Sequence, residues 1–313
     1  MSRRRALGRG LGELTNGSFS SIVEQGEPSS AAGPAPAPPP AGPLEVVAVA
    51  SGKGGTGKSI LTSNLGVLLS PASRVAVLDA DFALANAHIL LDLSPRFTAA
   101  HLITGQRTLS EVAMEGPRGM RLIPGGSGVP ELAAMSRASL GRLAERLAPL
   151  EEAADLLLID MPSGIDRQTL LFLHCADQVL VVTTEDVTAL TDAYALIKTL
   201  LARRPAATLA VVVNRARSYA GGLEAFQRIA HVARKFLGRE LVLGGIVPFD
   251  ESIEDSVAAR VPVCLHRPDS PAARALASLA ARLGTFHGTA PRDGEPFPAR
   301  LRRLAGGSPA AEA

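Results

Sequence analysis

Seven short apolar runs, separated by segments long enough to form helices, limit the folds that this 313-residue chain can adopt. Each run is nearly continuous in Val, Leu, Ile and Ala, which is typical of strands buried on both faces of a sheet. Helical spacers between such strands predict right-handed crossovers between parallel neighbours. We therefore expect one α/β domain with a doubly wound, mostly parallel sheet. The runs are 44–50, 74–80, 120–123, 156–159, 178–183, 208–213 and 241–247.

The two ends of the chain differ from this central region. Residues 1–43 are rich in Gly, Ser, Ala and Pro, and 33–43 are largely Pro and Ala. Such a composition favours extended polyproline structure and cannot bury a core. We expect a disordered tail and Pro-rich linker over 1–43, a single domain over 44–285, and a flexible C-terminal tail over 286–313.

Composition excludes several classes of protein. The formal charge is +2 and aromatic residues make up 4%, with no Trp, which argues against a base-stacking platform for single-stranded nucleic acid and against a strongly electrostatic DNA binder. The only cysteines, Cys175 and Cys264, lie far apart, so a disulfide framework, a zinc ribbon and an iron–sulfur cluster lack ligands. No apolar run approaches the ~20 residues of a membrane span, and no apolar stretch follows the arginines at 3–5. We expect a cytoplasmic protein.

A glycine-rich loop follows the first apolar run. Its sequence, Gly52-Lys-Gly-Gly-Thr-Gly-Lys-Ser59, fits the pattern G-x-x-x-x-G-K-[ST] between a strand and a helix. The glycines let backbone N–H groups surround phosphate oxygens, and the helix N-terminus adds its dipole. Lys58 is expected to neutralise the β- and γ-phosphates, and the Ser59 hydroxyl to reach Mg²⁺. The residues expected to contact the nucleotide here are Gly52, Gly54, Gly55, Thr56, Gly57, Lys58, Ser59 and Ile60.

Lysine usage supports this interpretation. The chain has only four lysines against 28 arginines, and two of the four, Lys53 and Lys58, lie in the loop. Lysine offers a compact point charge on a flexible stem, which arginine does not.

Acidic residues end two of the expected strands. Asp79 and Asp81 follow one run, and Asp160 ends another, so all three should lie at the sheet edge where α/β proteins bind ligands. A lone Asp at such a place can instead cap a helix, but two sets beside a phosphate loop favour a ligand site. We expect Ser59, Asp79 and Asp160 to organise Mg²⁺ and Asp81 to orient an attacking water.

With Lys53 at its second position, the loop resembles the deviant phosphate loop (Walker A motif) of the MinD/ParA family of dimerising ATPases. The resemblance runs from about 46 to 283 and is closest to the flagellar-number regulator branch, the FlhG/FleN proteins. The segments that carry it are Asp79-Ala-Asp-Phe-Ala-Leu-Ala-Asn86, Leu122-Ile-Pro-Gly-Gly-Ser-Gly128, Thr191-Asp-Ala-Tyr-Ala-Leu-Ile-Lys198 and Arg234-Lys-Phe-Leu237.

The resemblance implies a P-loop NTPase fold and a slow, partner-stimulated ATP hydrolase. It further implies a homodimer in the ATP-bound state, in which Lys53 reaches the partner's nucleotide and acts with Lys58 and Asp81 in catalysis. Such a protein would bind the inner face of the cell membrane peripherally and would count or position a cellular structure, the flagellum first. The residues implied to border the adenine are Asn214, Arg215, Pro248 and Asp250.

The sequence departs from the family pattern in places. Thr56 replaces the usual Val, and Ser59-Ile60 replace Thr-Thr, which leaves a hydroxyl for Mg²⁺. The N-terminal D-Q-A-type helix by which the flagellar branch stimulates a partner GTPase is missing. In its place, Leu7-Gly-Arg-Gly-Leu11-Gly-Glu-Leu14 resembles the stretch by which ParB-type proteins stimulate ParA ATPases, so Arg9 is a candidate modulator of turnover; the alternative is a disordered basic tail.

The C-terminal segment 296–307 resembles the short amphipathic membrane-targeting helix of MinD-type proteins. Phe297, Leu301 and Leu304 would contact lipid, and Arg300, Arg302 and Arg303 would face lipid phosphates. Two copies in a dimer would bind together. A frayed basic tail is the alternative.

A partition ATPase of the same family is an alternative function. A partition ATPase would coat DNA nonspecifically through an arginine patch, for which the candidates are Arg203, Arg204, Arg215, Arg217, Arg234 and Lys235. Metal-cluster carriers on this fold need a cysteine pair, and tyrosine kinases need a tyrosine cluster; this sequence has neither.

Overall fold

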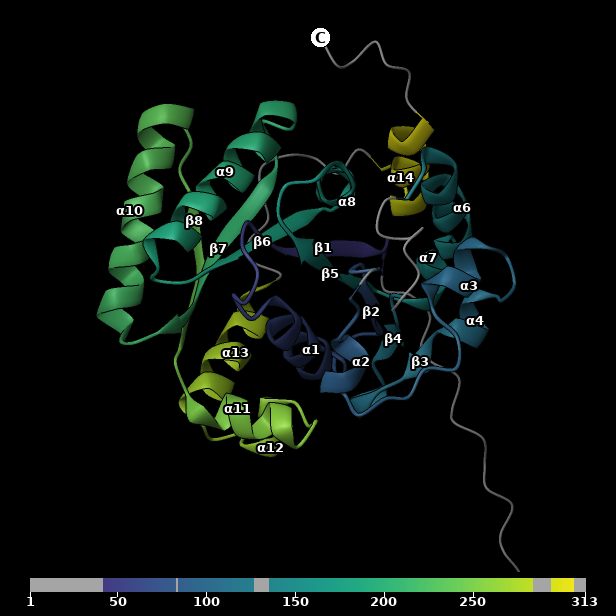
Figure 1. The fold of residues 1–313 in the computed structure, drawn as a ribbon, viewed down its shortest axis with the longest axis horizontal. Helices are drawn as coiled ribbons and strands as arrows, with labels where there is room; N and C mark the ends of the chain where they lie inside the picture. The colour runs from purple at the N-terminus through teal and green to yellow at the C-terminus, as the bar shows by residue number, and fades with distance from the viewer. Residues whose placement is uncertain (1–41, 83, 127–134, 284–293, 307–313) are drawn as a thin grey trace, which may run out of the picture. The chain divides into compact units, whose positions relative to one another are not determined.

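The computed structural model describes residues 42–82, 84–126, 135–283 and 294–306, and their centre is a sheet of eight strands (Figure 1). The strand order is β3-β4-β2-β5-β1-β6-β7-β8, and every neighbouring pair is parallel except β3 and β4. The expected doubly wound, mostly parallel sheet is confirmed. The strands are β1 Glu45–Ser51, β2 Val75–Asp79, β3 Met114–Glu115, β4 Arg121–Ile123, β5 Leu156–Ser163, β6 Gln178–Thr183, β7 Thr208–Ala216 and β8 Val242–Pro248.

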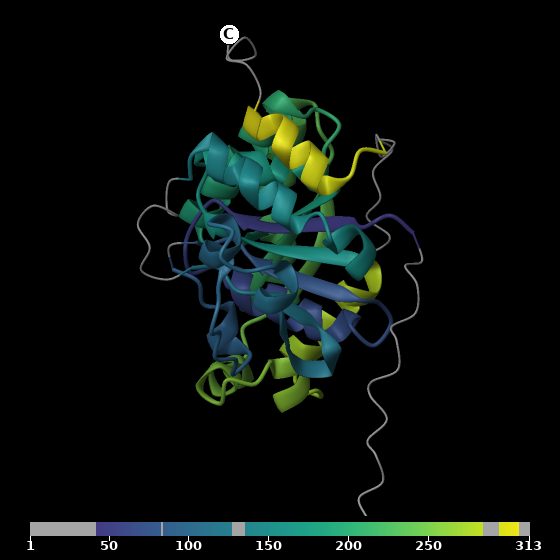
Figure 2. The ribbon, with the colours of Figure 1, turned by 90° about the vertical axis from the view of Figure 1, so that its right-hand side faces the viewer.

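The sheet is buried on both faces, which explains the continuous apolar runs. Alternate residues of β1 enter different cores: Val46 and Ala48 pack on one side, Val47 and Val49 on the other. Figure 2 shows the sheet between two helical layers. Helices α3, α4, α6 to α10 and α14 contribute to the first core, and α1, α2, α12 and α13 to the second.

The helices within the described residues have the following bounds. They are α1 Lys58–Leu69, α2 Ala87–Leu90, α3 Ala99–Ile103, α4 Leu109–Val112, the 3-10 helix Pro117–Gly119, α6 Arg137–Leu147, α7 Leu150–Ala153, α8 Arg167–Cys175, α9 Val187–Arg203, α10 Tyr219–Leu237, α11 Glu251–Ala258, α12 Val263–His266, α13 Pro271–Arg282 and α14 Phe297–Gly306. None of them is long and apolar enough to cross a membrane.

Each of the seven apolar runs corresponds to a strand, with ends that differ by up to four residues. The strand β3 was not expected, because its two residues, Met114 and Glu115, are too few to show a period. The stretch resembling ParB lies outside the described residues, as do Arg9 and most of the expected linker.

The C-terminal segment differs from the expectation of a flexible, lipid-facing tail. Residues 297–306 form α14, which packs beside α6 and against α8 (Figure 2). Phe297 and Leu301 are 1% and 0% exposed and belong to the core of the domain. Arg300 does not face outward either, because it pairs with Asp177 at 2.7 Å in a buried position. The apolar spacing predicted an amphipathic helix correctly but assigned its apolar face to the wrong environment.

Candidate nucleotide-binding site

The phosphate loop joins β1 to α1, as expected from its sequence. Gly55 and Gly57 have φ values of 78° and 86°, in the left-handed region that favours glycine. A side chain at Gly57 would also collide with the amide of Asn214. The Ser51 hydroxyl donates to the carbonyl oxygen of Lys53 at 2.7 Å and fixes the start of the loop. The helix N-terminus at Lys58 therefore opens onto a loop of exposed backbone, an arrangement suited to phosphate.

Lys58 is the buried cation of this site, with only 9% of its surface exposed. Burial lowers the pKa of its ammonium, while the nearby carboxylates of Asp160, Asp81 and Asp79 raise it, and burial is the larger effect. The structure thus brings together the four charged residues that the sequence analysis placed at this edge of the sheet.

Asp79 and Asp160 lie directly opposite each other on the neighbouring strands β2 and β5. They are 1% and 2% exposed. Burial is the main cause that raises the pKa of Asp79, to about 7, and the charge of Asp160 adds to it. Burial likewise raises the pKa of Asp160, to about 6, against the lowering effect of the Ser59 hydroxyl and Lys58. Lys58 acts on the pKa of Asp160, whereas the pKa of Asp79 is lowered by the backbone N–H groups of Ala87 and Asp81, and at both carboxylates burial outweighs these effects.

This donor set fits Mg²⁺. The ion prefers oxygen ligands and is usually held by one or two carboxylates together with substrate phosphates and water. Ser59 hydrogen-bonds Asp160, and the hydroxyl of Thr62 lies 3.5 Å from it, so hydroxyl and carboxylate oxygens meet at one point. Within the described ranges no three or more His, Cys, Asp or Glu side chains, these acids included, form a cluster that could hold a metal ion. A bound Mg²⁺ would therefore also need hydroxyl, phosphate and water oxygens.

Asp81 differs from the two buried acids in its environment. It is partly exposed, and its Oδ1 accepts a hydrogen bond from the backbone N–H of Leu84 at 3.0 Å. Its own N–H donates to Asp79 Oδ1 at 3.1 Å. The carboxylate of Asp81 is therefore held at the surface of the site, two residues after the buried Asp79.

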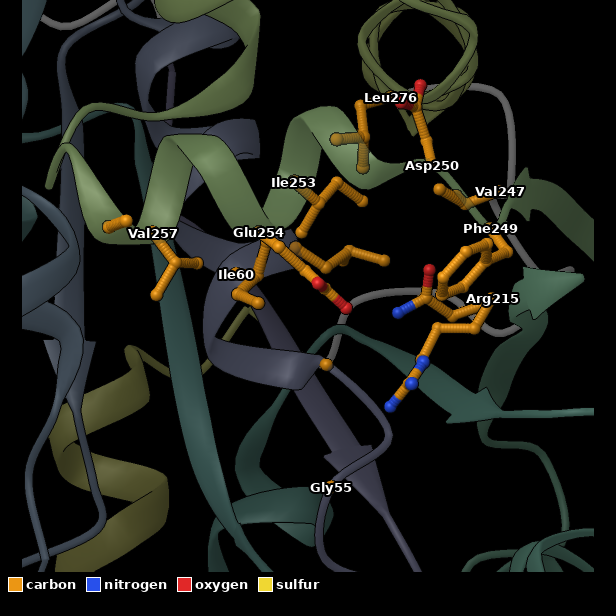
Figure 3. A pocket seen from close by; sticks show the side chains of 14 residues that line it. Gly55, Ile60, Arg215, Val247, Phe249, Asp250, Ile253, Glu254, Val257 and Leu276 are labelled. Carbon is orange, nitrogen blue, oxygen red and sulfur yellow. The ribbon is translucent and has the colours of Figure 1, made fainter.

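A cavity of about 430 Å³ adjoins the phosphate loop, on the side of α11. Figure 3 shows Arg215 and Phe249 on one side of it and Ile60 and Val257 on the other. Its lining is mostly apolar, as a site for a flat ring requires. Arg215, the penultimate residue of β7, has a φ of 56°, an uncommon value for a residue other than glycine.

The four residues expected near the adenine differ in their roles. Asn214 donates from Nδ2 to the carbonyl oxygen of Thr56 at 2.7 Å, so it ties the phosphate loop to β7. Asp250 lines the cavity but uses its carboxylate oxygens to cap α11, at Ser252 N, and α13, at Ala272 N. Pro248 ends β8 and is not part of the cavity lining.

Phe249 was missed by the sequence analysis, although it stands between two residues that were selected. It is 50% exposed, which is high for a large apolar side chain beside a cavity. The signal that would have found it is its position, directly after a buried strand that ends at the site.

Lys53 lies on the other side of the loop and lines a second cavity of about 430 Å³ with Thr184, Glu185 and Arg217. Its side chain is exposed, and its ammonium nitrogen lies 2.8 Å from Oγ1 of Thr188 in the first turn of α9.

The expected arginine patch is largely engaged within the chain. Arg204 donates to the carbonyl oxygens of Leu173 and Ala176, where it covers the end of α8. Arg234 pairs with Glu240. Of the remaining candidates, Arg215 lines the nucleotide cavity and Arg217 lies 4.0 Å from Glu185. The side chains of Arg217 and Arg234 are nevertheless 89% and 65% exposed.

Comparison with known proteins identifies the family to which this chain belongs. The chain matches the ParA family model, described as "NUBPL iron-transfer P-loop NTPase", over residues 44–284. It therefore belongs to the ParA/MinD family of P-loop NTPases.

Two individual relatives and one solved structure are similar to the chain over most of the matched region. The antiactivator FleN of Pseudomonas aeruginosa is 34% identical over 245 residues, which cover 78% of this chain and 88% of FleN. The flagellum site-determining protein YlxH of Helicobacter pylori is 33% identical over 195 residues, 62% of this chain and 65% of YlxH. The solved structure of the septum site-determining protein MinD with Mg-ADP, from Pyrococcus horikoshii, shares the fold with a TM-score of 0.64 and 22% identity, over 77% of this chain and 96% of that one.

The iron-transfer function named in the family description has no counterpart in the cysteines of this chain. Cys175 and Cys264 are both buried, and burial raises their pKa values to about 12 and about 11. Metal-binding thiols need the opposite, a thiolate stabilised at neutral pH.

Proposed function

We propose that this chain is a nucleotide-switched ATPase that counts or positions a cellular structure, with the flagellum as the favoured one. The similarity to FleN over most of both chains carries this proposal, together with the juxtaposition of Lys58, Asp79, Asp81 and Asp160 at one edge of the sheet. Fold alone would not carry it, because this fold supports many functions.

In the proposed mechanism the loop backbone and Lys58 hold the phosphates of ATP. Ser59, Asp160 and Asp79 would hold Mg²⁺, which would offset the negative charge of the phosphates. Asp81, whose Oδ1 accepts the backbone N–H of Leu84, would orient the attacking water. The apolar cavity beside Ile60 and Phe249 is the proposed site of the adenine ring, bordered by Asn214 and Arg215.

Turnover by one subunit should be slow, because few groups other than Lys58 are placed to stabilise charge in the transition state. We propose that ATP brings two subunits together, that Lys53 of each reaches the nucleotide of the other, and that a protein partner stimulates hydrolysis. ADP would then return the protein to the monomer. The exposed position of Lys53 at the edge of the loop supports this role.

We further propose that the protein associates peripherally with the inner face of the cell membrane. Helix α14 cannot provide the lipid contact while Phe297 and Leu301 are buried, so this contact needs either another surface or the release of α14. Sedimentation with anionic liposomes tests the proposal: more protein should pellet with ATP than with ADP, and equal pelleting would contradict it.

A cellular experiment tests the central function. The native copy is replaced by a Lys58→Ala variant, and flagella per cell are counted by electron microscopy. Lys198→Ala, at an exposed position near the C-terminal end of α9, is the control. A changed number or position of flagella in the Lys58→Ala strain alone supports the proposal. Normal flagella together with lost DNA segregation would favour the partition alternative, which salt-sensitive, ATP-dependent retention of DNA on filters would also indicate.

A further inference from the structure

Lys53, for which we propose a contact with a partner subunit, is held in this structure by its own subunit. Its ammonium donates a hydrogen bond to the hydroxyl of Thr188, 135 residues further along the chain, with 2.8 Å between the two atoms. Thr188 is the second residue of α9, and both side chains are exposed. The contact therefore lies at the surface, where a second molecule could compete for the ammonium.

The backbone fixes this contact, because the start of the loop packs directly against α9. The Ser51 hydroxyl holds the carbonyl oxygen of Lys53 at 2.7 Å. A side chain at Gly52 would collide with the backbone of Asp192, one turn beyond Thr188. With the loop this close to the helix, the ammonium of Lys53 is within reach of the Thr188 hydroxyl.

The contact is also weak enough to be exchanged. Its acceptor is a neutral hydroxyl, although Glu185 and Asp186 line the same cavity, and the described residues record no ion pair for Lys53. The N-terminal turn of a helix carries partial positive charge, which disfavours a cation there. A phosphate oxygen is a stronger acceptor for an ammonium than a hydroxyl is. Lys53 should therefore leave Thr188 when a phosphate comes within reach.

We propose that Thr188 is a positioning residue that retains Lys53 on its own subunit until a second subunit presents a nucleotide, and thereby opposes dimerisation. This inference rests on the proposed function, in which Lys53 acts across a dimer. Each dimer that forms breaks two Lys53–Thr188 contacts, one in each subunit. The free energy of this contact therefore enters the dimer affinity twice.

The first test measures dimer affinity by sedimentation with a nonhydrolysable ATP analogue and Mg²⁺. Thr188→Val replaces the hydroxyl with a methyl group of similar shape, and Thr188→Ser restores a hydroxyl. We expect the dissociation constant of the Thr188→Val dimer to fall about tenfold, roughly threefold for each contact, and that of Thr188→Ser to stay near wild type. Thr191→Val is the matched control, because Thr191 lies one turn away and its hydroxyl bonds only to Val187 O of its own helix, at 2.9 Å.

The second test needs no dimer. Acylation of lysines in the nucleotide-free protein is followed by mass spectrometry, and the chain has only three other lysines, of which Lys198 is the reference. Thr188→Val should raise the acylation rate of Lys53 about twofold relative to Lys198, because the ammonium is no longer held against α9.

The outcomes separate the two proposals. If wild type dimerises with the ATP analogue but Thr188→Val has the same or a larger dissociation constant, the role of Thr188 is refuted and the proposed dimer stands. An unchanged acylation rate of Lys53 likewise refutes the contact itself. If neither wild type nor Thr188→Val dimerises, the proposed ATP-dependent dimer fails, and the inference fails with it.

Discussion

The two ends of the central sheet both contain buried charges, but only one end neutralises them within the chain. At the amino ends of the strands, Arg300 of α14 pairs with Asp177 at 2.7 Å, and the side chains are 9% and 8% exposed. The second oxygen of Asp177 accepts the backbone N–H of Val46 at 2.9 Å. This cluster pairs its two buried charges within the chain.

At the carboxyl ends of the strands, Asp79 and Asp160 face each other with Lys58 as the nearest buried cation. Burial raises the pKa of both carboxylates by more than the nearby N–H groups, hydroxyls and ammonium lower it. The comparison teaches that a buried charge paired by the chain is structural, whereas one short of counter-charge marks a ligand site.

Removing the cation at the amino end should destabilise the fold. Arg300→Ala leaves Asp177 buried and unpaired, which should lower the free energy of unfolding by about 3–5 kcal/mol. Urea denaturation measures this. Arg302→Ala is the control, since that side chain is 64% exposed and lies 3.9 Å from Glu145, and it should change stability by less than about 0.5 kcal/mol. Equal stability of the two variants would mean that the buried pair does not hold α14.

Removing the cation at the carboxyl end should instead abolish function. Lys58→Ala should weaken ATP binding by at least about 100-fold, because a buried charge-assisted contact to phosphate is lost. Isothermal titration calorimetry with Mg-ATP measures the affinity. A variant that binds ATP as tightly as wild type would overturn the assignment of the site.

Neutralising one of the buried acids should stabilise the nucleotide-free protein. Folded-state pKa values of about 7 and about 6 lie above those of unfolded aspartates, so the folded state binds protons more tightly. This contribution is fully present below about pH 4 and is lost as the pH rises through about 6 to 7. Asp160→Asn should therefore raise stability at pH 8 by roughly 2 kcal/mol and flatten the dependence on pH between 5 and 8.

Thermal unfolding of Asp160→Asn at pH 5 and pH 8, without nucleotide or Mg²⁺, provides the measurement. The same variant should bind Mg-ATP more weakly than wild type. Lower stability than wild type at pH 8 would show that the carboxylate of Asp160 is already satisfied by the chain.

The exposed acid of the site should behave differently from the buried pair. Asp81→Ala should leave the affinity for ATP within about twofold of wild type, since Asp81 is partly exposed, and should stop turnover. Binding and steady-state hydrolysis are measured on the same preparation. A large loss of affinity would make Asp81 a metal ligand rather than a group that orients water.

The sequence was sufficient for the carboxyl end of the sheet because its residues have local signatures. Gly55 and Gly57 take the left-handed backbone that the loop pattern requires. Asp79 ends β2 and pairs with Asp160 of the neighbouring strand β5. Phe249 escaped notice because one aromatic residue after a strand has no pattern of its own.

The sequence was insufficient at the amino end for a physical reason. The spacing of Phe297 and Leu301 predicts an apolar helix face but not whether lipid or protein covers it. The pairing of Arg300 with Asp177 holds α14 against the protein. The two residues are 123 positions apart, and no local pattern in the sequence indicates such a contact.

The central claim, that the incomplete end of the sheet works as an ATP-dependent switch, is tested most directly by light scattering of the full chain. Asp81→Ala is used to prevent turnover, and its mass is measured with Mg-ATP and with Mg-ADP. The account predicts twice the monomer mass with Mg-ATP, the monomer mass with Mg-ADP, and the monomer mass with both nucleotides when Lys53→Ala is added. A monomer with Mg-ATP, or the same dimer with Mg-ADP, would contradict it.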